Sequence, residues 1–312
     1  MGRGLPAAPS LDLTVRPMVA AALGNTYRLS LPLSECAIRR DLLPIVRNAL
    51  RDRYTVHREI GRGGAARVFL ADDLGGRQVA LKVLHPELQV SVTAERFLRE
   101  IRLASRIDHP LVARVLDSGE ADWLVYYVMP FIEGPTLRVQ LDRGRQLSVD
   151  ASIRMTRDLL GALKAAHAVG IIHRDVKPEN IVLSGAGAVL LDFGIARAIE
   201  AAGTTQLTRS GIAVGTSAYM SPEQVQAATD IDHRTDLYSV GCVLFESLAG
   251  RPPFQHPNEV VVLQMHLNDP VPDIRTFRPE TPAEVAEVVM KSLAKNRDER
   301  WTSAEGMATA LG

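Results

Sequence analysis

The chain has 312 residues, and its 36 Lys plus Arg are balanced by 36 Asp plus Glu, so net charge gives no reason to expect nucleic-acid binding. Its 46% hydrophobic and 23% charged residues are typical of a globular protein, of a length that suits one large or two moderate domains. The two cysteines, Cys36 and Cys242, lie far apart, which argues against a disulfide scaffold and indicates a reducing compartment.

The sequence predicts a cytoplasmic protein without a membrane span. No apolar run approaches the roughly 20 residues that a spanning helix needs. The chain begins Met1-Gly2, but Pro6 stands where an acylation signal needs Ser or Thr, so we expect no lipid anchor. The apolar run at 18–23 is too short to indicate a secretory signal.

Residues 1–53 are interpreted as an N-terminal extension. Its first part, 1–33, mixes Pro, Ala, Gly and Leu without a clear period and predicts a poorly ordered segment. The second part, 34–53, predicts an amphipathic helix that packs on the following domain, with Pro44 tolerated in the first turn. The apolar positions at helical spacing are Leu42, Leu43, Val46 and Leu50.

A strand-rich region opens at Tyr54 and contains a glycine-rich turn. This turn, Gly61-Arg62-Gly63-Gly64-Ala65-Ala66-Arg67-Val68, lies between Ile60 and the apolar run that begins at Val68. Glycines permit positive φ and close backbone approach, so the N–H groups of the turn could lie over phosphates. Taken alone, the same residues favour an ordinary hairpin over a phosphate-binding turn.

A lysine stands in the middle of the apolar strand predicted over 78–84. Burying Lys82 without a partner would be costly, so the pattern predicts an acidic partner, although a lysine that reaches solvent from a sheet edge is the alternative. The best candidate is Glu100, in a helix predicted over 94–107, because neighbouring Phe97 places it on the protein-facing side.

Two further strands are predicted over 111–115 and 123–128, followed by Met129-Pro130-Phe131-Ile132-Glu133-Gly134. Beyond this segment the pattern becomes helical. Helices are predicted over 137–141, 152–169 and 232–248.

A short polar run from His173 to Asn180 lies between apolar segments. Pro178 excludes a helix interior, so the run predicts a tight loop with its side chains held firmly in place. Asp175 could accept a proton from a hydroxyl, and Lys177 could stabilise negative charge on a transferring group. Asn180 offers a neutral oxygen to a hard cation such as magnesium. Each charge, taken singly, could also be an ordinary surface residue.

Two further motifs follow this loop. Asp192-Phe193-Gly194 comes after a predicted strand at 188–191 and begins 17 residues after Asp175. A long segment rich in Thr and Ser, 195–218, then leads to Ser221-Pro222-Glu223.

In this order the motifs resemble those of the eukaryotic-like (Hanks-type) bacterial serine/threonine protein kinases, over residues 54–312. The polar loop resembles H-R-D-x-x-x-x-N, and Asp192-Phe193-Gly194 resembles D-F-G. Ala66 replaces the third glycine of G-x-G-x-x-G-x-V, and Ser221 replaces the alanine of A-P-E, both small changes. Lysine two residues after Asp175 matches the serine/threonine rather than the tyrosine class.

The resemblance implies an α+β, bilobal protein-kinase-like fold. A small antiparallel sheet with one key helix is expected over about 54–129, a hinge over 130–134 and a larger, mainly helical lobe over 135–312. ATP would bind between the lobes.

The resemblance also implies roles for individual residues. Asp175 would orient and deprotonate the substrate hydroxyl, and Lys177 would stabilise charge on the transferring group. Lys82, oriented by Glu100, would hold the α- and β-phosphates. Asn180 and Asp192 would bind Mg²⁺, with Mn²⁺ as an alternative metal.

Nucleotide contacts are expected from the glycine-rich turn, from both sides of the adenine ring and from the hinge. Met129 would be the gatekeeper, Pro130 would offer its carbonyl and Ile132 its N–H group. The expected contact residues are Ile60, Gly61, Gly63, Gly64, Val68, Ala80, Lys82, Met129, Pro130, Ile132 and Leu183.

Two supporting contacts and one switch complete the implied picture. Asp236 would brace the catalytic loop backbone, and Arg300 would pair with Glu223. Thr208 and Ser210 are candidate autophosphorylation sites, modified within a transient homodimer. Protein substrates bearing Ser or Thr are the expected partners. A pseudokinase-type binding module and a small-molecule phosphotransferase are the alternatives, and self-labelling with ATP would separate them.

Overall fold

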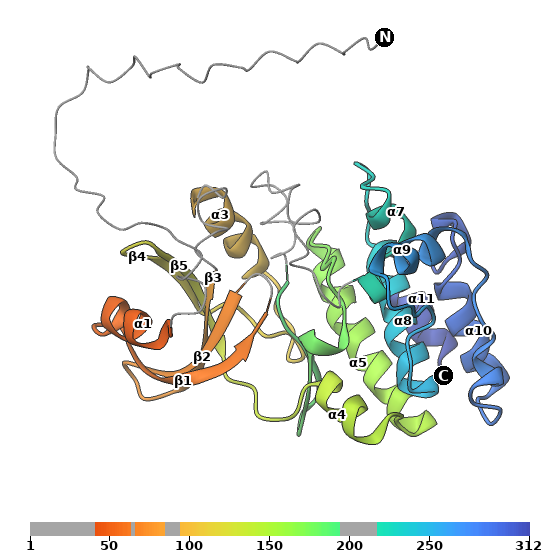
Figure 1. Cartoon of the computed structure of the whole chain (residues 1–312), viewed down its shortest axis with the longest axis horizontal. Coiled ribbons are helices and arrows are strands. Elements are labelled where there is room, and N and C mark those ends of the chain that lie inside the picture. The colour runs from red at the N-terminus through yellow and green to blue at the C-terminus, as the bar shows by residue number, and fades with distance from the viewer. Residues whose placement is uncertain (1–40, 64–65, 85–93, 194–216) are drawn as a thin grey trace, which may run out of the picture. The chain divides into compact units, whose positions relative to one another are not determined.

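The computed structural model describes residues 41–63, 66–84, 94–193 and 217–312, without the side chains of 94–97 and 100. A five-stranded antiparallel sheet is followed along the chain by a mainly helical region (Figure 1). This arrangement confirms the predicted α+β fold, and helix α3 (Ala94–Ala104) is the helix expected between strands of the sheet region.

The sheet has the strand order β1-β2-β3-β5-β4, and every neighbouring pair is antiparallel. The register places Lys82 opposite Val68 on one side and opposite Tyr127 on the other. The strands are β1 (Tyr54–Arg62), β2 (Ala66–Asp73), β3 (Gln78–Leu84), β4 (Asp117–Ala121) and β5 (Leu124–Pro130).

Helix α1 (Leu43–Leu50) covers one face of the sheet, here called the outer face, and the opposite face is called the inner face. The helix lies inside the range predicted from the sequence. Val46 and Leu50 of this helix are completely buried and pack in one cluster with Tyr126 and Val128 of β5. Arg47 adds a hydrogen bond from its Nε to the carbonyl oxygen of Val56, 2.8 Å away. Helix α1 therefore gives the outer face an apolar partner.

The inner face carries a second apolar cluster, which includes Ala80, Ile101, Tyr127 and Met129. Because both faces of the sheet are covered, β5 is apolar along almost its whole length instead of alternating with polar residues. Adjacent side chains of a strand point to opposite faces, so Tyr126 and Tyr127 belong to different clusters.

The strand predicted over 111–115 is wrong, because β4 begins later, at Asp117. This segment, which is apolar except for Arg114, instead runs beside β7 (Gly187–Leu190), where the Ala113 N–H donates to the Leu190 carbonyl at 3.0 Å. A tight turn with Asp122 at φ +53° sets the pairing of β4 with β5. A single isolated bridge between Val112 and Leu190 joins this run to β7, and the burial of Val112 and Ala113 explains its apolar character.

The helical region is built around α8 (Arg234–Ala249), which is buried from Thr235 to Leu248, as expected for a helix surrounded by protein. A Cβ on Gly241 would lie 2.6 Å from Ser292 Cβ, so α8 and α10 approach closely at this glycine. The other helices are α4 (Leu137–Gly144), α5 (Val149–Ala168), α7 (Pro222–Val225), α9 (Glu259–Asn268), α10 (Ala283–Ser292) and α11 (Ala304–Ala310). Short 3₁₀ turns lie at η2 (Pro178–Asn180), η3 (Ser217–Tyr219), η4 (Ile274–Thr276) and η5 (Arg297–Glu299).

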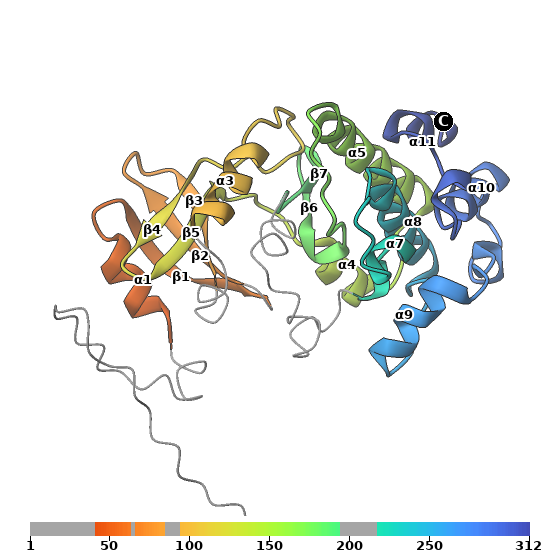
Figure 2. The same ribbon diagram turned by 90° about the horizontal axis from the view of Figure 1, so that it is seen from above.

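A two-stranded hairpin of β6 (Ile181–Ser184) and β7 follows the polar loop and leads to Asp192. Figure 2 shows this hairpin between the sheet region and α5. Among the helices that the structure describes, none combines the length and the apolar character needed to cross a membrane.

Candidate active site

One buried carboxylate of the helical region accepts hydrogen bonds from the backbone of the polar loop at 173–180. Asp236, on α8, is completely buried and accepts hydrogen bonds from the backbone N–H groups of His173 (2.9 Å) and Arg174 (2.8 Å). The ring Nε2 of His167 lies 2.7 Å from the same carboxylate. Arg174 has φ +65°, so its backbone occupies a region that needs such support. The predicted brace of the loop by Asp236 is confirmed.

His173 connects this loop to the segment that carries Asp192. Its Nδ1 accepts the N–H of Asp175 at 3.1 Å, so Nε2 carries the proton and donates to the Leu191 carbonyl at 2.7 Å. Its ring also packs edge-on against Phe193, with centroids 4.6 Å apart. The Leu191 N–H in turn donates to the Asn180 carbonyl at 2.9 Å. This backbone hydrogen bond therefore joins the segment of Asn180 to the segment of Asp192, the two candidate metal ligands.

The side chains of Asp175, Lys177 and Asn180 contact one another on the polar loop. Asp175 Oδ2 lies 2.9 Å from Lys177 Nζ and 3.0 Å from Asn180 Nδ2. Asn180 Nδ2 also donates to the Asp175 carbonyl at 2.8 Å, so its amide oxygen is the atom suited to ligate a cation. Asp175 keeps 26% of its side chain exposed, so its carboxylate can be reached from solvent.

Asp192 is held between two strands of the sheet. Lys82 Nζ lies 2.5 Å from its Oδ2, and the Tyr127 hydroxyl donates to its Oδ1 at 2.8 Å. Burial would raise the pKa of Asp192, but Lys82 and the hydrogen bond from Tyr127 outweigh burial and hold that pKa below its usual value. The carboxylate therefore remains ionised, as a metal ligand must be.

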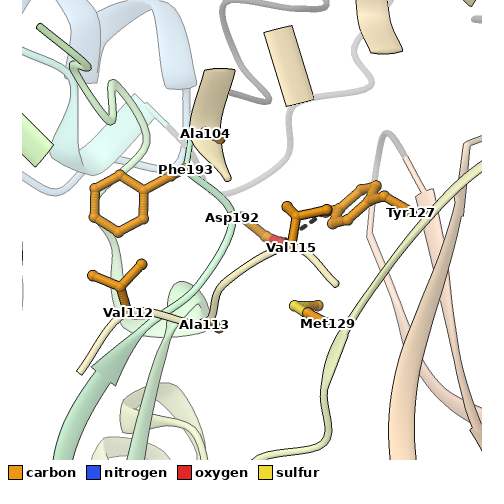
Figure 3. A pocket seen from close by; sticks show the side chains of 8 residues that line it. All are labelled: Ala104, Val112, Ala113, Val115, Tyr127, Met129, Asp192 and Phe193. Atoms are coloured by element: carbon orange, nitrogen blue, oxygen red, sulfur yellow. Dashed lines mark hydrogen bonds between the residues drawn. The ribbon is translucent and has the colours of Figure 1, made fainter. Parts of the chain in front are cut away.

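A small cavity of about 10 Å³ lies beside Asp192, which is roughly the room that one water needs. Figure 3 shows the hydroxyl of Tyr127 directed at Asp192 across one side of this space. The lining residues are Ala104, Val112, Ala113, Val115, Tyr127, Met129, Asp192 and Phe193.

Five of the residues expected to surround adenine come from the sheet and the hinge. Ile60, Val68, Ala80, Met129 and Ile132 belong to, or pack against, the inner apolar cluster of the sheet. They form one group in space, although they span more than 70 residues of sequence.

Hydrogen bonds and strand pairing hold the chain at both ends of the hinge. Pro130 closes β5 opposite Val79, and the Leu183 N–H donates to the Pro135 carbonyl at 2.9 Å. Leu183 itself packs against the core of the helical region. Gly134 has φ +141°, and a Cβ at this position would lie 2.2 Å from the Leu183 carbonyl oxygen. Only glycine fits so close to the β6 backbone.

Part of the predicted site lies outside the described residues. This applies to Gly64 in the glycine-rich turn, to the side chain of Glu100 and to Thr208 and Ser210. Gly61 and Gly63 are described, and Gly61 pairs with Val68 across β1 and β2. The partner of Lys82 that the structure describes is Asp192.

The Ser-Pro-Glu segment is tied to both the helical core and the polar loop. Arg300 binds Glu223 through two parallel hydrogen bonds of 2.8 Å, which confirms the predicted pair. Burial would raise the pKa of Glu223, but Arg300 lowers it below its usual value. Gln224 Nε2 donates to the Arg174 carbonyl at 2.7 Å, so α7 also supports the loop from the side.

Sequence reasoning missed Tyr127, Gln224 and Arg138. Arg138 of α4 donates from Nε to Glu179 at 2.9 Å and from Nη1 to Glu246 at 2.8 Å, next to the polar loop. Only for Tyr127 did the sequence contain a usable signal, because strand alternation places it on the same face as Met129.

A family model described as the protein kinase domain matches residues 54–311, a range that contains the sheet, the braced polar loop and the pair of Lys82 with Asp192. The chain belongs to the protein kinase family. It is 40% identical over 266 residues to a probable serine/threonine-protein kinase of Streptomyces coelicolor. It is 42% and 41% identical, each over 270 residues, to the serine/threonine-protein kinases PknB of Mycolicibacterium smegmatis and Mycobacterium tuberculosis.

These alignments cover 83–84% of this chain but only 39–43% of the relatives. The chain therefore spans about two fifths of the length of the curated relatives that it matches. A protein kinase domain implies ATP and a divalent metal as its cofactors.

Proposed function

We propose that this chain is a serine/threonine protein kinase that transfers the γ-phosphoryl group of Mg-ATP to Ser or Thr hydroxyls of proteins. One observation carries the proposal: Asp175 Oδ2 faces both Lys177 Nζ, at 2.9 Å, and Asn180 Nδ2, at 3.0 Å. A carboxylate, an ammonium group and an amide thus meet at one accessible point of a braced loop.

In this proposal Asp175 accepts the proton of the substrate hydroxyl as its oxygen attacks the γ-phosphorus. The bond from that phosphorus to the β,γ-bridging oxygen breaks, and ADP leaves. Lys177, now on Asp175, stabilises the negative charge of the group in transfer. Most of the rate acceleration comes from positioning and electrostatics, which the fixed loop backbone supports.

Asp192 and Asn180 would hold the divalent metal. Both offer oxygen atoms, and magnesium is usually bound by one or two protein oxygens together with waters and substrate phosphates. This donor set therefore fits the metal. When bound, the metal would neutralise charge on the phosphates. Lys82 would exchange its present bond to Asp192 for the α- and β-phosphates, since its flexible stem allows it to turn.

The Ser-Pro-Glu segment supports a protein rather than a small molecule as the substrate. Its Glu223 is anchored to Arg300, and its Gln224 contacts the loop backbone at Arg174. Such anchoring gives an extended substrate a firm surface beside Asp175. The relatives named above, both PknB enzymes among them, are described as serine/threonine-protein kinases.

Incubation with γ-labelled ATP, Mg²⁺ and a general protein substrate tests the proposal, with an Asp175→Asn variant as the control. We expect label on Ser and Thr with the wild-type chain and at least ~10²-fold less with the variant. ATP binding without transfer would indicate a pseudokinase-type binding module. Labelling of small hydroxyl compounds, with none on protein, would favour a small-molecule phosphotransferase.

We further propose that the enzyme phosphorylates itself at Thr208, Ser210 or both, within a transient homodimer. A phosphate adds about −1.5 to −2 charge and could pair with Arg174, next to Asp175 in the sequence, and with Arg197, near the start of the Thr- and Ser-rich segment. Mass spectrometry of the purified wild-type chain beside the Asp175→Asn variant decides this. Absence of phosphate at both positions, or full activity of a Thr208→Ala, Ser210→Ala double variant, would contradict the switch.

A further inference from the structure

Two adjacent tyrosines of β5 have the same side chain, the same strand and almost the same burial, but different partners. Tyr127 is 1% exposed and its hydroxyl meets Asp192 Oδ1 at 2.8 Å, on the inner face of the sheet. Tyr126 is 0% exposed, and its hydroxyl accepts a hydrogen bond from Arg53 Nη1 at 2.5 Å, away from the site. Only Tyr127 therefore touches a candidate catalytic group.

Tyr127 and Lys82 hold Asp192 together. They are cross-strand partners on β5 and β3, and each donates to a different oxygen of the carboxylate. A carboxylate with one donor on each oxygen cannot rotate without losing both bonds. Asp192 also has φ +67°, which is uncommon for a residue other than glycine and needs support from its surroundings.

The two donors differ in how firmly they are fixed. Lys82 has a flexible four-carbon stem and is needed at the phosphates in the proposed mechanism. Tyr127 has a rigid ring packed in the inner apolar cluster. Its hydroxyl is therefore held in place for the hydrogen bond to Asp192 Oδ1.

We propose that Tyr127 is a positioning residue that fixes the carboxylate of Asp192 for the divalent metal after Lys82 has turned to the nucleotide. The inference rests on the proposed role of Asp192 as a metal ligand. Each carboxylate oxygen has two lone pairs, so the tyrosine hydroxyl can occupy one and leave the others for the cation. Tyr127 contributes no atom to the metal site itself.

Isothermal titration of the full chain with ATP, once with Mg²⁺ and once with EDTA, tests this inference through binding alone. We expect Tyr127→Phe to reduce the gain in affinity due to Mg²⁺ about tenfold, the effect of losing one hydrogen bond to a charged group. Affinity in EDTA should stay within twofold of wild type. Tyr126→Phe is the matched control, because it removes a buried hydroxyl contact on the opposite face, and its magnesium gain should equal that of wild type.

An Asp192→Asn variant in the same titrations separates the inference from the proposed function. If this variant loses the magnesium gain and Tyr127→Phe keeps it within twofold, Tyr127 does not position the carboxylate. If Asp192→Asn keeps the gain as well, the metal-ligand role of Asp192 itself is wrong. Equal losses in Mg²⁺ and EDTA for Tyr127→Phe, with a lower melting temperature, would show a purely structural hydroxyl and overturn the inference.

Discussion

The carboxylates of the reacting site and those of its framework are held in different ways. Asp236 and Glu223 belong to the framework that supports the site, and their carboxylates accept hydrogen bonds from fixed donors. Backbone N–H groups donate to Asp236, and the guanidinium group of Arg300 donates to both oxygens of Glu223. Asp175 and Asp192, at the site, are held largely by the ammonium groups of lysines, which can move to a substrate. We therefore expect substitutions in the framework to lower mainly the stability of the fold, and substitutions at the site to lower mainly the turnover.

The largest effect is expected from breaking the buried framework pair. Arg300→Leu would leave the Glu223 carboxylate buried without its partner, and such a loss typically costs about 3–5 kcal/mol of unfolding free energy. Urea denaturation measures the change. Arg275→Leu, which removes an exposed pair with Asp273, is the control and should change stability little. A loss as small as that of the control would contradict the distinction drawn above.

Asp175→Asn should show the opposite pattern. We expect turnover to fall by at least ~10²-fold, since a proton acceptor is lost, while Mg-ATP affinity and the melting temperature remain close to wild type. The side chain is partly exposed and bonded to mobile groups, so the fold depends on it little. A large drop in melting temperature would place Asp175 in the framework instead.

Asp236→Asn should affect both properties, each more mildly. The amide has one oxygen for the two loop N–H groups and brings its own N–H donors, so one charge-assisted bond is lost, which is worth about 1.5–3 kcal/mol. Denaturation should show this loss together with a turnover reduced about tenfold. Unchanged turnover would mean that the loop keeps its geometry without the brace.

A smaller effect is expected from pH, through His266 in the helical core. Burial, aided by the charge of Lys295, lowers the pKa of His266 from 6.5 to about 3. Between these values the unfolded chain binds a proton that the folded chain excludes, so stability is complete above about pH 6.5 and falls as the pH drops toward 3. His266→Gln should therefore lose less melting temperature than wild type between pH 7 and 4.5. His256→Gln, at an exposed histidine, should follow wild type.

The smallest effect is expected from removing residues 1–33. This stretch has no periodic apolar face with which to pack, so activity and melting temperature should hardly change. Removing 1–53 is the contrast, because it takes away α1 and uncovers the outer face of the sheet, where Val46 and Leu50 are buried. A loss of several degrees on removing 1–33 alone would show that this segment belongs to the fold.

The order of the elements and the buried framework contacts could be predicted from the sequence because they follow from motifs. The pair of Arg300 with Glu223 and the brace at Asp236 are of this kind. The strand predicted over 111–115 failed for a physical reason. A short apolar run shows that a segment is buried, but it does not show whether that segment joins a sheet.

The contacts of Tyr127 could not be predicted, since they depend on the register of β3 against β5 and on the path of the chain to Asp192. Likewise, the contacts of Gln224 and Arg138 join segments 50 and 41 residues apart in the sequence, which no local pattern reveals. Sequence periodicity indicates which face of an element is buried. It does not indicate what lies opposite.

The pairing of Lys82 with Asp192 can form only late in synthesis of the chain, because 110 residues separate the two. At a synthesis rate of about 5–20 residues per second, Lys82 leaves the peptidyl-transferase centre roughly 6–22 seconds before Asp192 is made. Helix α1 precedes the sheet in the sequence, so the cover of the outer face is available from the start. The inner face must wait for β7 and Asp192. During synthesis, the face that carries the chemistry is therefore the last part of the sheet to be completed.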